Sequence, residues 1–182
     1  AGKGQRDLVC VTVGTGIGGG IVLDGVLYRG RFGIGAEFGH MQVIPDGRRC
    51  GCGQNGCWEQ YCSGRALVRE AREVADVWPG LGARLLELGG GFPEGIIGPA
   101  VTQAAREGDP AALECVRIIG ESLGQGLADL AAILDPGMFV VGGGVAEAGE
   151  LLVGPARHVY AQRLTGGTHR PHAPIALAKL GN

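Results

Sequence analysis

Four side chains able to bind one metal ion lie close together in this chain, and they constrain its fold more than any other feature. They are His40, Cys50, Cys52 and Cys57. One imidazole and three thiolates form a closed tetrahedral ligand set for structural Zn²⁺. Such binding contributes about 10–16 kcal/mol in small zinc peptides, against about 2–4 kcal/mol for one disulfide. We therefore expect a zinc-ordered loop; the alternatives are three reduced thiols, or one disulfide and a free cysteine.

A carboxylate lies just outside each end of this ligand set. Glu37 precedes His40 by three residues, and Glu59 follows the last cysteine by two. A zinc-bound imidazole keeps its second ring nitrogen protonated as a donor, and carboxylates accept strong hydrogen bonds from hydroxyl groups. These three groups predict a cradle for a polyhydroxylated ligand. The alternative is that both acids are ordinary surface residues or pair with Arg31 or Arg65.

Glycine is unusually abundant, at 37 of 182 residues, and two of its clusters follow apolar runs. The first, at residues 14–20, begins with Gly14, Thr15 and Gly16, whose N–H groups and hydroxyl could bind phosphate oxygens. It matches neither the Walker A nor the Rossmann pattern, and a tight hairpin is the simpler interpretation. The second cluster is Gly142, Gly143 and Gly144. Two glycine turns at strand ends of one sheet favour a nucleotide cleft.

Hydrophobic periodicity and turn signals predict an α/β fold with a mixed five-stranded sheet. The expected strands are residues 7–13, 20–23, 26–28, 138–141 and 175–178, with a further short strand at 41–44. The expected helices are residues 64–77, 99–106, 110–134 and 147–164, and residues 80–98 are expected to be irregular. Ser63 and Asp109 are suitable caps for the first and third helices. Glycines inside the third helix indicate that another segment packs closely there.

Composition and charge argue against several classes of partner. The net charge is −2 and the basic residues form no stripe, so we expect no nucleic-acid partner. The longest uncharged run, residues 8–23, is too short and glycine-rich to span a membrane. Cys10, Cys62 and Cys115 lie in apolar segments and are expected to be buried free thiols. Free thiols favour a reducing, cytoplasmic location.

The two ends of the chain indicate a piece of a longer protein. The chain begins at Ala1 without an initiator Met, and it stops at Leu180-Gly181-Asn182 just after an apolar strand.

Taken together, these motifs resemble those of the ROK family of sugar kinases and sugar-responsive repressors. The matching segments are Gly14 to Gly20, Glu37-x-Gly39-His40, Cys50-x-Cys52-Gly53-x₂-Gly56-Cys57-x-Glu59 and Val140-Val141-Gly142-Gly143-Gly144. The resemblance implies an actin-like ATPase (RNase H-like) fold of two domains. It further implies that residues 1–182 are most of the larger, C-terminal domain, with a zinc and sugar loop at 37–59, and that the N-terminal domain is absent from this chain.

The resemblance also implies a role for each motif residue. Glu37, His40 and Glu59 would bind sugar hydroxyls, and His40 would share the zinc ion with the three cysteines. Thr15 and its neighbouring glycines would contact the phosphates of ATP, which binds with Mg²⁺. The second glycine cluster, Gly142, Gly143 and Gly144, would lie near the adenosine.

Some family motifs are missing from these residues. The N-terminal Asp-Gly-Gly-Thr phosphate loop has no counterpart here, and neither has the Asn-Asp pair whose Asp is the general base. The family's closing helix would lie beyond Asn182. Because phosphoryl transfer depends on positioning across a closed cleft, we expect no catalytic residue in this chain and no turnover by it alone.

Within the family, the resemblance favours ATP-dependent phosphorylation of glucose to glucose 6-phosphate, the glucokinase activity. One alternative is a sugar-sensing transcriptional repressor, and another is a kinase for a different hexose. The glycine-rich turn at residues 14–20 favours a kinase, since a regulator need not hold a triphosphate. A homo-oligomer, either a dimer or a tetramer, is the expected assembly.

Overall fold

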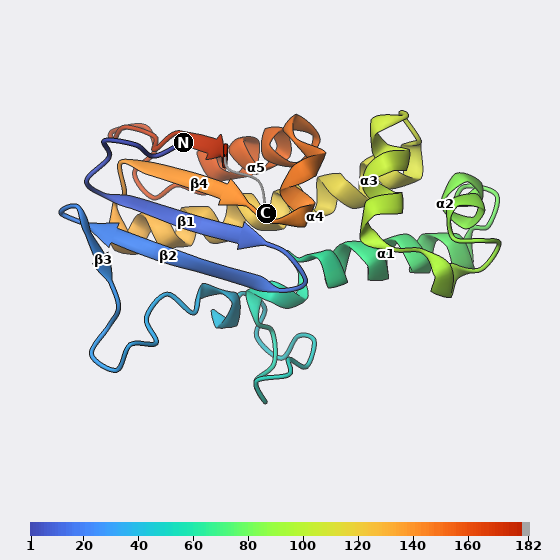
Figure 1. Cartoon of the computed structure of the whole chain (residues 1–182), viewed down its shortest axis with the longest axis horizontal. Coiled ribbons are helices and arrows are strands. Elements are labelled where there is room, and N and C mark those ends of the chain that lie inside the picture. The colour runs from blue at the N-terminus through green and yellow to red at the C-terminus, as the bar shows by residue number, and fades with distance from the viewer. Residues whose placement is uncertain (180–182) are drawn as a thin grey trace.

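The computed structural model of the protein describes residues 1–179; the C-terminal Leu180-Gly181-Asn182 and the helix expected beyond it lie outside the described residues. Five strands form one sheet in the order β3-β2-β1-β4-β5 (Figure 1). The strands are β1 (Leu8–Val13), β2 (Ile17–Leu23), β3 (Val26–Tyr28), β4 (Met138–Gly142) and β5 (Ile175–Leu177). The predicted mixed five-stranded α/β sheet is therefore confirmed.

The sheet combines an antiparallel meander with parallel crossover strands. β1 and β2 are antiparallel, with Val9 opposite Ile21, while β1 and β4 run parallel. A two-residue turn joins β2 to β3, with positive φ angles of 52° at Asp24 and 79° at Gly25. Positive φ at both central residues is the requirement of the tight hairpin turn that an Asp-Gly pair predicts.

Five α-helices and four 3-10 turns connect and cover the strands of the described chain. The helices are α1 (Gly64–Val77), α2 (Ala83–Leu88), α3 (Gly98–Arg106), α4 (Pro110–Leu134) and α5 (Glu150–Arg163). Both expected caps are present, because Ser63 accepts a hydrogen bond from the Ala66 N–H and Asp109 accepts one from the Ala112 N–H. Each bond satisfies a backbone donor that a helix start leaves free.

The main core lies between one face of the sheet and the helices. Val9, Val11 and Val13 are fully buried, whereas the alternate residues of β1 are more exposed, so the sheet is apolar on one face. α4 and α5 run along that face (Figure 1). The two helices approach closely at Gly124, where an added Cβ atom would lie only 2.2 Å from the Ala156 carbonyl oxygen. This contact explains glycine inside a long helix.

The structure differs from the sequence prediction at four segments. β2 begins at Ile17, so the second half of the glycine cluster is strand rather than turn. Residues 41–44 form no strand; Gln42 makes only an isolated bridge to Cys57, within the same loop. α2 was not predicted, since glycines on both sides obscure its six residues. The helix expected at 147–164 is interrupted at Gly149, whose φ is +64°.

No helix among the described residues is long and apolar enough to cross a membrane. Cys62 and Cys115 are buried free thiols, as predicted. Cys10 is only partly buried, which corrects the prediction. Its position on β1 alternates with the buried valines and therefore faces the other side of the sheet.

Candidate functional site

The four predicted metal ligands converge. The ligand atoms of His40, Cys50, Cys52 and Cys57 all lie within 4.8 Å of one another. The Cys50 Sγ is 3.6 Å from the His40 Nδ1, and the Cys52 Sγ is 3.6 Å from the Cys57 Sγ. A tetrahedral zinc ion with ordinary bond lengths separates two sulfur ligands by about 3.8 Å. The spacing and donor types thus fit a zinc ion, and all six cysteines are free thiols rather than disulfides.

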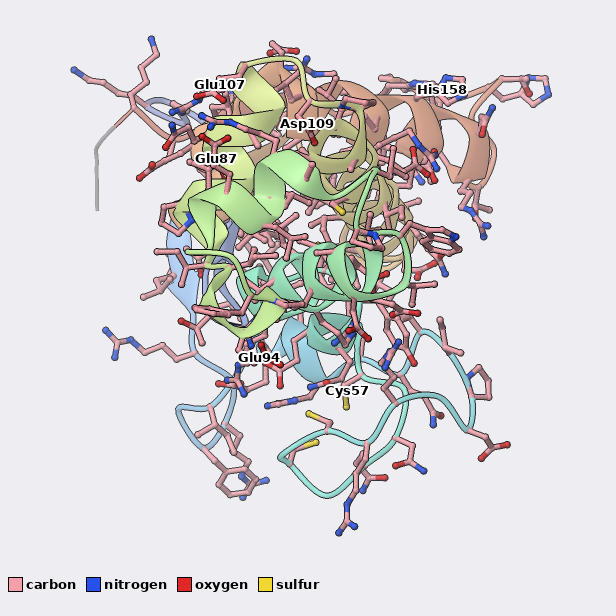
Figure 2. All side chains as sticks on the ribbon, turned by 90° about the vertical axis from the view of Figure 1, so that its right-hand side faces the viewer. Cys57, Glu87, Glu94, Glu107, Asp109 and His158 are labelled. Carbon is pink, nitrogen blue, oxygen red and sulfur yellow. The ribbon has the colours of Figure 1, made fainter. Side chains whose placement is uncertain are left out.

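Backbone hydrogen bonds give the metal loop its shape. The Cys50 N–H donates to the Gln54 carbonyl at 2.8 Å, which closes the tight turn between the cysteines. Gly56 has a φ of +75°, and a Cβ atom there would lie 1.7 Å from the Ile44 carbonyl oxygen. Only glycine is compatible with both the conformation and the contact. The loop sits at the lower end of the molecule, with sulfur atoms gathered near Cys57 (Figure 2).

The thiols of the cluster are not equivalent. Burial raises the pKa of the Cys57 thiol to about 12, whereas a hydrogen bond from the backbone of Gln54 lowers the pKa of Cys52. Thiolates are the form that binds zinc, and a bound cation deprotonates a coordinating thiol. A zinc ion at this cluster would therefore reverse the effect of burial on Cys57.

A short 3-10 turn, η1 (Phe38–His40), carries the metal-ligating histidine and packs directly on β2. A Cβ atom at Gly19 would lie 2.1 Å from the Phe38 ring, and one at Gly39 would lie 2.5 Å from the Ile17 carbonyl oxygen. The glycines of β2 thus allow the Phe38 ring to lie on the strand, and this contact positions His40 beside the sheet.

Glu59 connects the metal loop to the glycine turn between β1 and β2. Its Oε1 is 3.1 Å from the Cys50 Sγ, and a Cβ atom at Gly16 would lie 2.4 Å from its Oε2. Because the Nδ1 of His40 faces the sulfur atoms, its Nε2 is left to donate to a ligand. The structure therefore brings an imidazole donor, a carboxylate acceptor and a phosphate-binding type of turn into one region.

Glu37 is exposed at the start of η1, and its carbonyl accepts a hydrogen bond from the His40 N–H at 3.1 Å. Within residues 1–179, neither Glu37 nor Glu59 forms an ion pair with Arg31 or Arg65. Arg65 instead donates to the Thr15 carbonyl. The Glu37 carboxylate and the Oε2 of Glu59 thus remain available to a ligand, while the Glu59 Oε1 accepts a hydrogen bond from the Cys50 thiol.

A cleft of about 900 Å³ opens beside the glycine turn, between that turn, α1 and the start of α3. Gly14 and Thr15 line it from the β1–β2 turn, and Gly144 lines it from the end of β4. Gly16 lines a smaller adjoining hollow of about 310 Å³, together with Gly14 and Thr15. Gly142 and Gly143 line neither space. Gly143 has a φ of +92° and packs against the backbone of Val13. It turns the chain after β4, and the next residue, Gly144, lines the cleft.

Sequence reasoning missed most of the cleft wall. Arg65, Arg69 and Arg72 line it from α1, and residues 96–99 line it from the segment that leads into α3. The arginines are spaced by four and three residues, which places them on one face of a helix. That spacing is visible in the sequence, but it does not reveal what the face contacts.

Comparison with known proteins agrees with the fold and the motifs. The ROK family profile matches residues 1–182. The chain belongs to the ROK family. It is 50% identical to a glucokinase from Streptomyces coelicolor over 181 residues, which is all of this chain and 57% of that relative. The mixed sheet and its helices match the actin-like fold of ROK sugar kinases.

ROK proteins of two kinds are similar to this chain. A crystal structure of a ROK glucokinase from Streptomyces griseus with glucose and AMPPNP superposes with a TM-score of 0.95 and 52% identity, and covers 100% of this chain and 58% of that one. A xylose repressor from Caldicellulosiruptor bescii is 32% identical over 157 residues, covering 86% of this chain and 38% of the repressor. The chain thus spans little more than half the length of the two Streptomyces glucokinases.

Proposed function

We propose that this chain forms part of an ATP-dependent glucokinase, which converts glucose to glucose 6-phosphate. The observation that carries the proposal is the approach of Glu59 to Gly16, because it joins the polyol cradle to the glycine turn beside the cleft. A kinase needs its acceptor hydroxyl and its phosphate donor side by side. Supporting this proposal, the S. griseus relative was solved with glucose and AMPPNP, and the S. coelicolor relative is named a glucokinase.

In this proposal, Glu37, His40 and Glu59 bind the sugar. The carboxylates accept hydrogen bonds from sugar hydroxyls, and the His40 Nε2 donates one. Zinc, held by His40 and the three cysteines, would order the loop and fix the imidazole orientation. The metal is thus structural, and its four ligand positions are all filled by the protein.

The nucleotide would bind in the cleft. Backbone N–H groups of Gly14, Thr15 and Gly16, together with the Thr15 hydroxyl, would bind phosphate oxygens. Gly144 would lie near the adenosine, directly after the turn that Gly142 and Gly143 make at the end of β4. Mg²⁺ would enter with ATP and neutralise charge on the transferred phosphoryl group.

The chain would act as the C-terminal domain of a two-domain kinase, with the zinc and sugar loop at residues 37–59. Its 182 residues contain neither an Asp-Gly-Gly-Thr motif nor an Asn-Asp pair. The general base would come from the remaining part of the protein. We therefore expect no turnover by the chain alone. We also expect the full-length enzyme to be a homo-oligomer. The free thiols favour a cytoplasmic location.

A sugar-sensing repressor is the second candidate, because the xylose repressor relative aligns with 86% of this chain. A repressor would keep the polyol cradle and the zinc loop but would not need to bind a triphosphate. A ROK kinase for another hexose would differ in the sugar that it accepts. Nucleotide binding separates the repressor from both kinases, and a hexose panel separates the kinases.

The deciding experiment is a coupled ADP-release assay on the full-length protein with ATP, Mg²⁺ and a panel of hexoses. Turnover with glucose well above mannose, fructose and N-acetylglucosamine is the expected result. Turnover with another sugar would transfer the proposal to that hexose. No turnover by folded, zinc-loaded protein would favour the repressor.

A further inference from the structure

Three arginines of α1 face the cleft. Arg65, Arg69 and Arg72 lie along one wall, and Glu147 is the single acidic residue that lines the space within the part of the chain that the structure describes. An excess of cationic side chains in a cleft attracts anionic ligands. Glu147 can neutralise at most one of the three arginines. The hydrogen-bond partners of each arginine therefore show which of them is free to bind a ligand.

Arg69 and Arg72 are already used to hold protein segments together. Arg69 donates from Nη2 to the Gln60 carbonyl at 2.6 Å and to the Glu70 carboxylate at 3.3 Å. Arg72 donates to the Glu94 carbonyl at 2.6 Å and to the Ile96 carbonyl at 2.9 Å. These bonds tie α1 to the metal loop on one side and to the segment before α3 on the other. The Nε of Arg69 has no hydrogen-bond partner among residues 1–179, but it is buried, whereas the bonds above fix both side chains in the cleft wall.

Arg65 is different. Its Nε donates to the Thr15 carbonyl at 3.2 Å, and among residues 1–179 neither of its Nη atoms has a hydrogen-bond partner. The side chain is exposed and lines the cleft next to the glycine turn. One edge of its guanidinium is thus anchored to the turn, while the remaining N–H donors are free.

The start of α1 is itself attached to the same turn. The Gly64 N–H donates to the Gly14 carbonyl at 2.7 Å, and Figure 1 shows α1 beginning beside the β1–β2 turn. Arg65 therefore reaches Thr15 from a backbone that is already bonded to the turn. Less side-chain entropy is lost on binding when a donor is held in place beforehand.

We propose that Arg65 binds the terminal phosphates of the nucleotide, whereas Arg69 and Arg72 do not. This inference rests on the proposed function, since it assigns the anion in the cleft to a nucleoside di- or triphosphate. A guanidinium presents a planar set of donors that matches two phosphate oxygens at once. With Nε bonded to Thr15, Arg65 would hold the turn and the phosphates in one hydrogen-bonded unit.

The test compares Arg65→Gln with the matched control Arg72→Gln, which removes the same charge from the same helix face. Binding of ADP with Mg²⁺ to the full-length protein would be measured by isothermal titration, and binding of adenosine by saturation-transfer NMR. Zinc content and circular dichroism would verify that each variant is folded. Repeating the ADP titrations at several salt concentrations would report the charge contribution, because salt screens exposed charges.

Arg65→Gln should weaken ADP binding by roughly 10- to 100-fold, the range for loss of charge-assisted hydrogen bonds, and should leave adenosine binding unchanged. It should also reduce the salt dependence of ADP binding. Arg72→Gln should alter ADP and adenosine affinity by similar factors, because it changes the cleft wall. Arg65→Lys should recover part of the ADP affinity, since it keeps the charge without the planar donor set.

Three results would overturn the inference. If Arg65→Gln weakens ADP and adenosine equally, or neither of them, the side chain is not a phosphate ligand. If Arg72→Gln selectively weakens ADP, the phosphates lie elsewhere on the wall. If the folded, full-length wild-type protein binds no ADP at all, the nucleotide assignment of the cleft fails together with this inference, whereas the first two results leave the kinase proposal standing.

Discussion

Replacing Gly126 by Ala tests whether the metal loop is held by packing against α4. Helix propensity alone predicts a stabilisation of about 1 kcal/mol, because Ala is a better helix former than Gly. The structure predicts the opposite sign. A Cβ atom at Gly126 would lie 2.2 Å from Cε2 and 2.3 Å from Cζ2 of Trp58. Trp58 is fully buried and follows the metal ligand Cys57 directly.

The magnitude follows from what the indole ring must do. To restore ordinary carbon–carbon contact it must retreat by more than 1 Å, since such contacts are optimal at about 3.5–4.0 Å. Overpacking of this kind costs typically about 1–3 kcal/mol. The movement also strains the bond from the Trp58 Nε1 to the Ser122 carbonyl, now 2.9 Å, and a typical hydrogen bond contributes about 0.5–1.5 kcal/mol. After the propensity gain, we expect a net destabilisation of about 1–3 kcal/mol.

Urea unfolding of the zinc-loaded chain would measure this difference. Asp129→Ala is the control for helix propensity: Asp129 lies on the exposed side of α4, and within residues 1–179 its carboxylate forms no hydrogen bond or ion pair. It should stabilise the chain by up to about 0.7 kcal/mol. The packing argument is refuted if Gly126→Ala is as stable as the wild type or more stable. A zinc affinity unchanged in a destabilised Gly126→Ala would show that Trp58 supports the core but not the metal loop.

Three further predictions concern the site. Cys57→Ser should lose bound zinc by elemental analysis and unfold at lower urea, whereas the buried non-ligand variant Cys62→Ser should retain zinc; equal zinc content in the two would contradict the ligand assignment. Glu59→Gln and Glu37→Gln should each weaken glucose binding to the full-length protein by roughly 10-fold or more, the loss expected for a charged hydrogen-bond acceptor, while zinc stays bound; release of the metal instead would show that the carboxylate serves the zinc site. Gly16→Ala should displace the Glu59 carboxylate, because the new Cβ would lie 2.4 Å from its Oε2. Calorimetric titration should then show weaker glucose binding with zinc unchanged, and an unaltered affinity would mean that Glu59 adjusts at no cost.

Local chemistry was readable from the sequence wherever one residue type determines one conformation. The Asp24-Gly25 pair predicted the hairpin turn, and the Ser63 and Asp109 caps predicted the starts of α1 and α4. The metal ligands were also recognisable, because few other arrangements use three cysteines and a histidine in one short loop. Residues 41–44 were wrongly predicted as a strand, since an apolar run of that length has no fixed partner until the loop folds around it.

Glycine illustrates where sequence reasoning stopped. Residues 14–20 form one glycine-rich run in the sequence, yet only Gly14 to Gly16 form the turn. Gly19 belongs to β2, where the absence of a side chain makes room for Phe38. Turn and packing uses of glycine look alike in a sequence, because both depend on a missing Cβ atom. What that atom would collide with is known only from the folded chain.

By itself, the sequence determined the metal-ligand types, the helix caps and the hairpin turn, all of which depend on neighbours a few residues away. The tertiary structure alone decided which distant groups meet. Arg65 reaches Thr15 across 50 residues, and Trp58 bonds Ser122 across 64. Such contacts form when buried apolar faces pack together, and no local pattern specifies which pairs of polar groups the packing will bring within hydrogen-bond distance.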